Sequence, residues 1–120
     1  MNIYYLYIHL SCAFLLYVTD KPDQASIEPS SNYLTHGTSF SLTCNSSYAK
    51  PDIQQYRWQK NGVNLTETNI TLLFDSLNYA DDDGDYTCSA VNLVGEGMTS
   101  PTEKIYVTCK RFQLLLMNNT

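Results

Sequence analysis

The amino-acid sequence predicts an all-β protein, a sandwich of about seven short strands in two antiparallel sheets. Three observations lead to this prediction. Apolar and polar residues alternate in short runs, which is the pattern of a strand with one buried face. Pro, Gly, Asn, Asp and Ser separate the runs, as turn residues do. Two of the four cysteines lie inside such runs, at positions that face inward.

Length and composition indicate one small acidic domain. The chain has 120 residues, of which 43% are hydrophobic, and a formal net charge of −5. A domain of this size buries only roughly 60 to 65% of its unfolded surface, so covalent cross-links would stabilise it appreciably. The negative charge and the lack of a basic face argue against binding to nucleic acid or to an anionic membrane.

Residues 1–19 are predicted to be a signal peptide. Ile3 to Val18 is almost wholly apolar, lacks Lys and Arg, and stops at Asp20 and Lys21. Small residues at 11–13 offer one cleavage point and the region near Thr19 offers another, so the sequence does not decide between the two cleavage sites. An uncleaved anchor is the main alternative, although this stretch is shorter than the roughly 20 residues that span a bilayer. A buried core helix is the third alternative for this segment.

Alternation places five strands after this segment, between residues 20 and 108. Asn61 and Gly62 predict a tight turn after the second strand, because both residue types tolerate positive φ. Ala25 to Ile27 and Val63 to Leu65 complete the set of about seven. The inward-facing residues of the five strands are Phe40, Leu42 and Cys44; Tyr56 and Trp58; Ile70, Leu72 and Phe74; Tyr86, Cys88 and Ala90; and Ile105 and Val107.

Cys44 and Cys88 are predicted to form a buried disulfide. Both point inward and lie on strands that face each other across two sheets about 10 Å apart. Closing a loop of this length would stabilise the fold by about 4 kcal/mol on the chain-entropy model. The bridge requires an oxidising compartment, which agrees with the predicted export.

These residues resemble the immunoglobulin fold. Cys44, Trp58 and the run Asp82-x-Gly84-x-Tyr86-x-Cys88 are similar to its B-strand cysteine, C-strand tryptophan and F-strand signature. The segments 56–65 and 88–95 look like those of I-set and C2-set domains of cell-adhesion molecules and receptor ectodomains. The resemblance covers roughly residues 23 to 108, within an expected domain of residues 20–108.

The resemblance implies scaffold roles for the signature residues. Trp58 should pack on the disulfide, and the Tyr86 hydroxyl should bind backbone near Asp82 as a tyrosine corner. The stretch between the cysteines is too short for a variable-type domain, so antigen-binding loops are not expected. Leu77 lies about one position too far upstream of the Asp82-x-Gly84 turn, which predicts an extended or bulged loop between strands E and F.

No catalytic residue, metal site or cofactor is expected. His36 stands alone beside Gly37, and no nucleophile with a base and an orienting group is evident. The acidic run at residues 81–85 resembles the start of an EF-hand loop, but Tyr86 falls where that loop needs its Gly. We therefore expect residues 81–85 to form a solvated acidic turn. We do not expect the protein to be an enzyme.

Four N-x-Ser/Thr sequons predict N-glycosylation. We expect glycans at Asn45, Asn64 and Asn69, which fall at strand ends or in loops, and discount Asn118 near the terminus. Glycans at Asn64 and Asn69 would shield the C′ to E edge. The contact surface would then be the opposite G, F and C face or the loop from Asn92 to Gly97, whose Leu93 and Val94 either meet a partner or only cap the sandwich.

Residues 109–120 form an irregular tail that fits no domain pattern. The apolar run Phe112 to Met117 is too short to cross a membrane. Cys109 would be unpaired, which favours an intermolecular disulfide or a free thiol. Alternatively, codons for Cys109 to Arg111 can contain a splice-donor-like sequence, and the tail is then a read-through into an intron.

The sequence therefore predicts an extracellular protein-binding module for cell adhesion or receptor recognition, whether complete or a truncated soluble form of a longer protein. Its expected partner is another cell-surface or extracellular protein. Membrane attachment is expected only if the first segment stays uncleaved or the chain is a fragment of a membrane protein. The alternative function is a structural spacer in an extracellular-matrix or muscle array.

Overall fold

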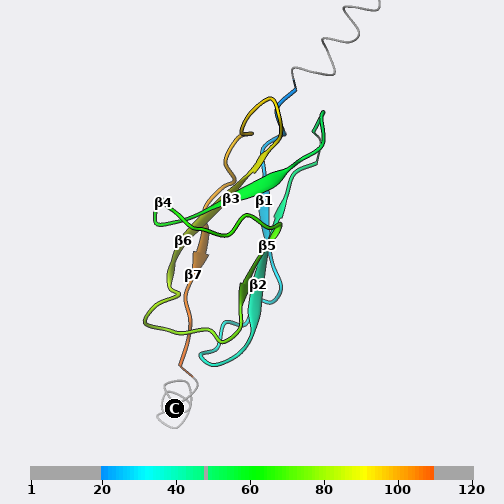
Figure 1. Cartoon of the computed structure of the whole chain (residues 1–120). Coiled ribbons are helices and arrows are strands. Elements are labelled where there is room, and N and C mark those ends of the chain that lie inside the picture. The colour runs from blue at the N-terminus through cyan, green and yellow to red at the C-terminus, as the bar shows by residue number, and fades with distance from the viewer. Residues whose placement is uncertain (1–19, 48, 110–120) are drawn as a thin grey trace, which may run out of the picture.

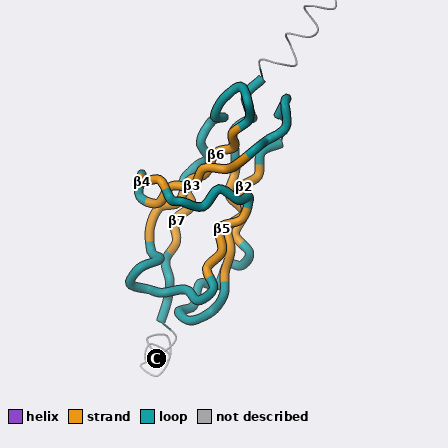
Figure 2. Tube along the Cα trace, viewed as in Figure 1, coloured by secondary structure: helices purple, strands orange, loops and turns teal. Residues whose placement is uncertain are grey.

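The computed structural model describes residues 20–47 and 49–109, which contain seven strands and no helix (Figure 2). Accordingly, no helix in this part of the chain has the length and apolar character of a membrane span. The predicted signal peptide and all of the tail beyond Cys109 lie outside the described residues. The strands are β1 (Ser26–Pro29), β2 (Phe40–Asn45), β3 (Gln55–Lys60), β4 (Val63–Asn64), β5 (Thr71–Phe74), β6 (Gly84–Val91) and β7 (Glu103–Ile105).

The strands form two antiparallel sheets, which confirms the predicted fold class. One sheet has the order β1-β2-β5 and the other the order β4-β3-β6-β7 (Figure 1). The described chain begins at one end of the sandwich, beside the loop after β6, and ends at the opposite end (Figure 1). After β1 the chain crosses to the second sheet, where Thr35 pairs in parallel with Thr108 just beyond β7.

The core lies between the sheets and contains the predicted inward-facing residues of β2, β3 and β6. Leu42 and Trp58 are fully buried, and Ile105 of β7 is 1% exposed. Cys44 of β2 and Cys88 of β6 form a disulfide with a Cα–Cα distance of 6.1 Å, as predicted. This bridge is the covalent link between the two sheets within the described residues.

One inward-facing residue was predicted wrongly. Ile70 is 45% exposed and lies just before β5 rather than in it. Its backbone carbonyl accepts a hydrogen bond from Cys44 N, so the ladder with β2 has begun, but its side chain stays outside the core. The preceding residue, Asn69, belongs to the segment that crosses from β4, and its carbonyl is held by Trp58 Nε1 at 2.9 Å. The crossing segment therefore sets the orientation here, and alternation applies only from Thr71 onward.

The tight turn at Asn61 and Gly62 is confirmed. Both residues have positive φ, 52° and 80°, the conformation that a two-residue hairpin turn requires. The Asn61 side chain also accepts a hydrogen bond from Asp85 N at 2.9 Å, which ties the turn to β6.

The loop between β5 and β6 contains a hydrogen-bonded turn. Leu77 is 1% exposed and belongs to the core, and the turn follows it directly; the expected extension of this loop stays a prediction. Asp82 N donates to Asn78 O at 2.9 Å, and Asn78 N donates to Asp82 Oδ2 at 2.7 Å. Two reciprocal bonds thus close the turn and deliver the chain to the start of β6.

Candidate protein-contact face

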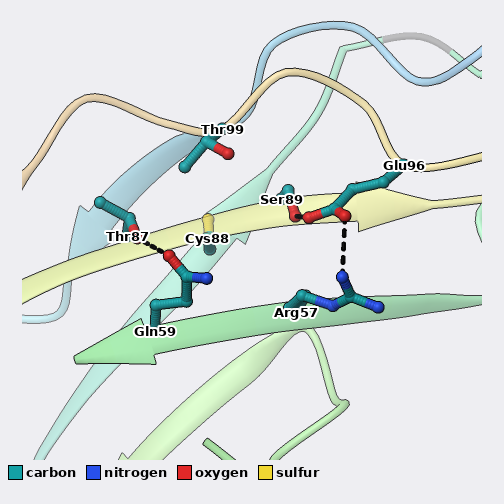
Figure 3. Close-up of a pocket in the computed structure, with 7 residues that line it drawn as sticks. All are labelled: Arg57, Gln59, Thr87, Cys88, Ser89, Glu96 and Thr99. Carbon is teal, nitrogen blue, oxygen red and sulfur yellow. Dashed lines mark hydrogen bonds and ion pairs between the residues drawn. The ribbon is translucent and has the colours of Figure 1, made fainter. Parts of the chain in front are cut away.

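The outer face of the four-stranded sheet carries a shallow polar pocket. The register between β3 and β6 pairs Arg57 with Ser89 and Gln59 with Thr87, so these side chains point away from the core together. Glu96 and Thr99, from the segment after β6, complete the rim of the pocket (Figure 3).

Glu96 is held in place by two side chains of this face. Its carboxylate accepts a hydrogen bond from Arg57 Nη1 at 2.8 Å and another from Ser89 Oγ at 2.5 Å (Figure 3). The Arg57 and Glu96 side chains are 46% and 37% exposed, so the ion pair adds at most about 1 kcal/mol of stability. Its structural effect is to fix the direction of two charged side chains on an exposed face.

Asn92 holds the loop that follows β6. Its side chain is almost fully buried, at 3% exposure. Its Oδ1 accepts hydrogen bonds from Val94 N and Gly95 N at 2.9 and 3.2 Å, and its Nδ2 donates to Asp20 O and Pro51 O, both at 2.9 Å. Both donors and both acceptor positions of the carboxamide are therefore used. One side chain thus joins the start of the domain and the two loops at this end of the sandwich.

The segment after this loop packs directly on the beginning of the domain. Gly97 N donates to Ala90 O at 2.8 Å, and a Cβ added at Gly97 would lie only 2.4 Å from the Pro22 carbonyl oxygen. Glycine is required at this position because the backbone of the early segment occupies the space of a side chain. Ala25 N then donates to Met98 O at 3.1 Å, which continues the contact.

The two predicted contact residues differ in accessibility. Leu93 lies at the tip of the loop and is 75% exposed, whereas Val94 is half-buried. Leu93 can therefore meet a partner with most of its side chain. Partner contact by either residue stays a prediction.

The signature residues occupy scaffold positions. Trp58 pairs across strands with Cys88 and shares the core with the disulfide. The Tyr86 hydroxyl donates to Asp82 O at 2.8 Å, which is the predicted corner. Burial raises the pKa of Tyr86 to about 12, with smaller contributions from the negative charges of Asp82 and Asp83. Gly84 is the first residue of β6.

The acidic turn is more ordered than the predicted solvated one. Besides the bond from Asn78 N to the Asp82 carboxylate, Val107 N donates to Asp83 Oδ1 at 2.6 Å. Lys60 Nζ also bonds to Asp81 O. The sequence showed only a run of like charges, because two of these donors, Lys60 Nζ and Val107 N, come from distant positions in the chain.

The predicted glycosylation sites are all exposed, but they do not share one surface. The Asn45 side chain, at the end of β2, donates to Glu28 Oε2 at 3.2 Å. Asn64 of β4 accepts from Gln59 Nε2 at 2.9 Å and therefore lies on the outer face of the four-stranded sheet. Asn64 also belongs to the edge strand of that sheet, and shielding of the C′ to E edge by glycans at Asn64 and Asn69 stays a prediction. Occupancy of the three sites stays a prediction.

Cys109 is half-buried and is not disulfide-bonded within the described residues. Its intermolecular disulfide stays a prediction. His36 is exposed but not isolated, because its Nδ1 accepts a hydrogen bond from Tyr79 N at 3.2 Å and its ring lies 5.2 Å from that of Tyr79. The described residues contain no group of three or more His, Cys, Asp or Glu side chains arranged to hold a metal ion.

Sequence reasoning missed the residues that shape this face. Arg57 is far from Ser89 and Glu96 in the sequence, and the three residues form no motif. Asn92 did carry a signal, because an Asn side chain in a loop commonly binds the backbone N–H two residues on in an Asx-turn, as Asn92 Oδ1 does with Val94 N. Its bonds to Asp20 and Pro51 had no sequence signal.

Comparison with known proteins agrees with this architecture. The sequence profile of the immunoglobulin domain matches residues 22–92. Among solved structures, the full ectodomain (Ig1–Ig3) of mouse nectin-like molecule 4 aligns with a TM-score of 0.59 and 29% identity, over 75% of this chain and 31% of that one. No curated protein sequence shows a significant match.

Two further structures share the fold at lower identity. The N-terminal four Ig domains of Dscam1 isoform 6.9 give a TM-score of 0.58 and 20% identity, over 71% of this chain and 20% of that one. Three N-terminal domains of the bacteriophage RB49 Hoc capsid protein align with a TM-score of 0.60 and 17% identity, over 70% of this chain and 28% of that one. The chain thus spans about a third or less of each of these structures. With the profile match, the buried disulfide and the tyrosine corner, the chain belongs to the immunoglobulin superfamily.

Proposed function

We propose that this domain is an extracellular recognition module that binds another protein. The contact surface would be the outer face of β3 and β6 together with the loop from Asn92 to Gly97. One observation carries the proposal: Leu93 is 75% exposed at the tip of a loop whose conformation is fixed by a buried side chain.

A braced loop favours binding for a thermodynamic reason. Association loses free energy when flexible groups must be ordered at the interface, and a loop already held in one conformation avoids much of that loss. The Asn92 carboxamide supplies the brace through its bonds to Val94 N, Gly95 N, Asp20 O and Pro51 O. Leu93 then offers an apolar anchor, and the neighbouring pair Arg57 and Glu96 offers charges of fixed direction.

Three features support an extracellular location. The buried disulfide is of a kind that persists in oxidising compartments. Asn45, Asn64 and Asn69 are exposed sequons. The similarity to a nectin-like ectodomain supports a role in adhesion or receptor recognition, and because the chain spans only about a third of that ectodomain, this role is part of the proposal. Binding rather than catalysis is proposed, since both core cysteines are used in the disulfide.

The test is saturable binding of the labelled, secreted protein to a panel of cell surfaces and to the immobilised protein itself. Leu93→Asp should weaken binding at least about ten-fold, which corresponds to about 1.4 kcal/mol. Leu73→Asp is the matched control, because Leu73 is 68% exposed but lies on the other sheet.

Equal binding by the wild type and Leu93→Asp would remove the loop from the contact surface. Absence of saturable binding on every surface would instead favour the spacer function.

A further inference from the structure

We propose that an N-linked oligosaccharide on Asn69 covers the open edge of β5 and keeps the domain monomeric. The inference rests on the export that the proposed function requires. It concerns the three-stranded sheet, on the side of the molecule opposite to the proposed contact face.

β5 is a terminal strand with free backbone groups. It pairs with β2 alone, in the order β1-β2-β5. Cys44 N donates to Ile70 O at 2.8 Å, and the register continues through Leu42 with Leu72. In an antiparallel pair, alternate residues direct their backbone groups toward the partner strand and away from it. The N–H and C=O groups of Thr71 and Leu73 therefore point to the unpaired edge.

The other three strand edges are each protected by a device that β5 lacks. β1 ends in Pro29, which has no N–H to offer, and β4 is only two residues long. β7 carries the charged residues Glu103 and Lys104, and the segment just beyond it pairs in parallel through Thr35 and Thr108. β5 spans four residues, Thr71–Phe74, with no Pro and no charged side chain. Leu73 is 68% exposed on its outer face, so this edge has the features of a template for self-association.

The sequon at Asn69 overlaps this edge. Its hydroxyl residue, Thr71, is the first residue of β5 and one of the two with outward backbone groups. The Asn69 side chain is exposed and makes no hydrogen bond within the described structure, so a glycan displaces no contact. Its backbone is fixed, because Trp58 Nε1 binds its carbonyl at 2.9 Å. A glycan attached there would stand at a defined point beside the edge.

The glycan is the occupant that these observations favour over a second copy of the chain. A bulky, hydrated oligosaccharide at the first residues of a short strand blocks the approach of another strand. Removing the glycan should therefore expose the edge to a second copy, paired through β5 in antiparallel orientation.

The experiment uses the full chain secreted from eukaryotic cells in a Cys109→Ser background, which excludes a disulfide-linked dimer through that residue. Molar mass is measured by size exclusion with light scattering, in the absence of any binding partner. Asn69→Gln and Thr71→Ala both destroy the sequon and should raise the molar mass about two-fold. Thr71→Ser keeps the sequon, and Asn45→Gln and Asn64→Gln remove other sequons, so these three variants should stay monomeric.

One further measurement tests the proposal if Asn69→Gln folds poorly, and a second tests the edge if it folds well. The Asn45→Gln/Asn64→Gln variant can be folded with its glycan and then treated with an N-glycanase, which should convert monomer to dimer. Adding Leu73→Lys to Asn69→Gln should restore the monomer, because like charges then meet across the paired edges.

Either of two results would overturn the inference. The first is a secreted wild-type protein whose Asn69 carries no glycan. The second is a folded, deglycosylated protein that stays monomeric, with the amides of Thr71 and Leu73 exchanging with solvent as fast as before. Neither result bears on partner binding through Leu93, so each of the two proposals can be refuted without refuting the other.

Discussion

The two sheets of this sandwich share a core but differ in how their outer faces are built. In the four-stranded sheet, the central strand β6 has partners on both sides, and its outer side chains engage Arg57, Gln59 and Glu96. In the three-stranded sheet, β5 has one partner and presents Leu73 beside the small side chains of β2. The first face joins charged and polar side chains around Glu96, whereas the second exposes Leu73 on a strand with a single partner. The same fold thus offers one face suited to recognition and one suited to being covered.

Breaking the link between the sheets should have the largest effect. Cys44→Ala with Cys88→Ala removes the bridge from β2 to β6, and should lower the free energy of unfolding by about 4 kcal/mol. Urea denaturation followed by Trp58 fluorescence measures it. Cys109→Ser is the control and should change stability little. A loss below about 1 kcal/mol in the double variant would show that packing alone holds the sheets together.

Removing the brace of the loop should have the next largest effect. Asn92→Ala leaves two N–H groups and two carbonyls without their partner, and should cost about 2 to 3 kcal/mol in unfolding free energy. Asn32→Ala, an exposed loop substitution, is the matched control and should stay within about 0.5 kcal/mol. Hydrogen exchange of the Val94 and Gly95 amides should rise in Asn92→Ala. Unchanged exchange there would mean that the loop is held by something other than Asn92.

The tyrosine corner should contribute a smaller, pH-dependent amount. Tyr86→Phe removes the bond to Asp82 O and should cost about 1 kcal/mol near neutral pH. The folded pKa of Tyr86, about 12, lies above the ordinary value of 10.0, so its contribution is complete below pH 10 and is lost as pH rises toward 12. Denaturation of both proteins from pH 8 to 12 tests this. The stability difference between wild type and variant should shrink over the upper part of that range, and a constant difference would refute it.

The exposed ion pair should matter least for stability. Arg57→Ala and Glu96→Ala should each change the free energy of unfolding by less than about 1 kcal/mol, because both side chains are partly solvated. A double-mutant cycle gives their coupling, which should fall as salt is raised. Coupling well above 1 kcal/mol would mean that the outer face stabilises the fold as well as carrying charge.

Sequence patterns predicted the strands and the core of this domain, but not the polar contacts on its outer surface. Alternation and the cysteines predicted the seven strands and the disulfide, because burial on a strand has a fixed two-residue period. Ile70 failed because a contact from Trp58, distant in sequence, fixes the segment before β5. The Glu96 network and the long-range bonds of Asn92 could not be predicted, since their geometry exists only after the sheets have paired. A local motif can therefore reveal the core and the turns, but not the polar surface.

The most direct test of the account is to place a new glycan on each outer face in turn. Arg57→Asn with Gln59→Thr creates a sequon in the middle of β3, and Ser41→Asn creates one on β2 with Thr43 as its hydroxyl residue. Once mass spectrometry shows both sites occupied, saturable binding of the two glycoproteins is compared with that of the wild type. We expect the glycan on β3 to abolish binding and the glycan on β2 to leave it unchanged. Binding that survives the β3 glycan, or is lost with the β2 glycan, would contradict it.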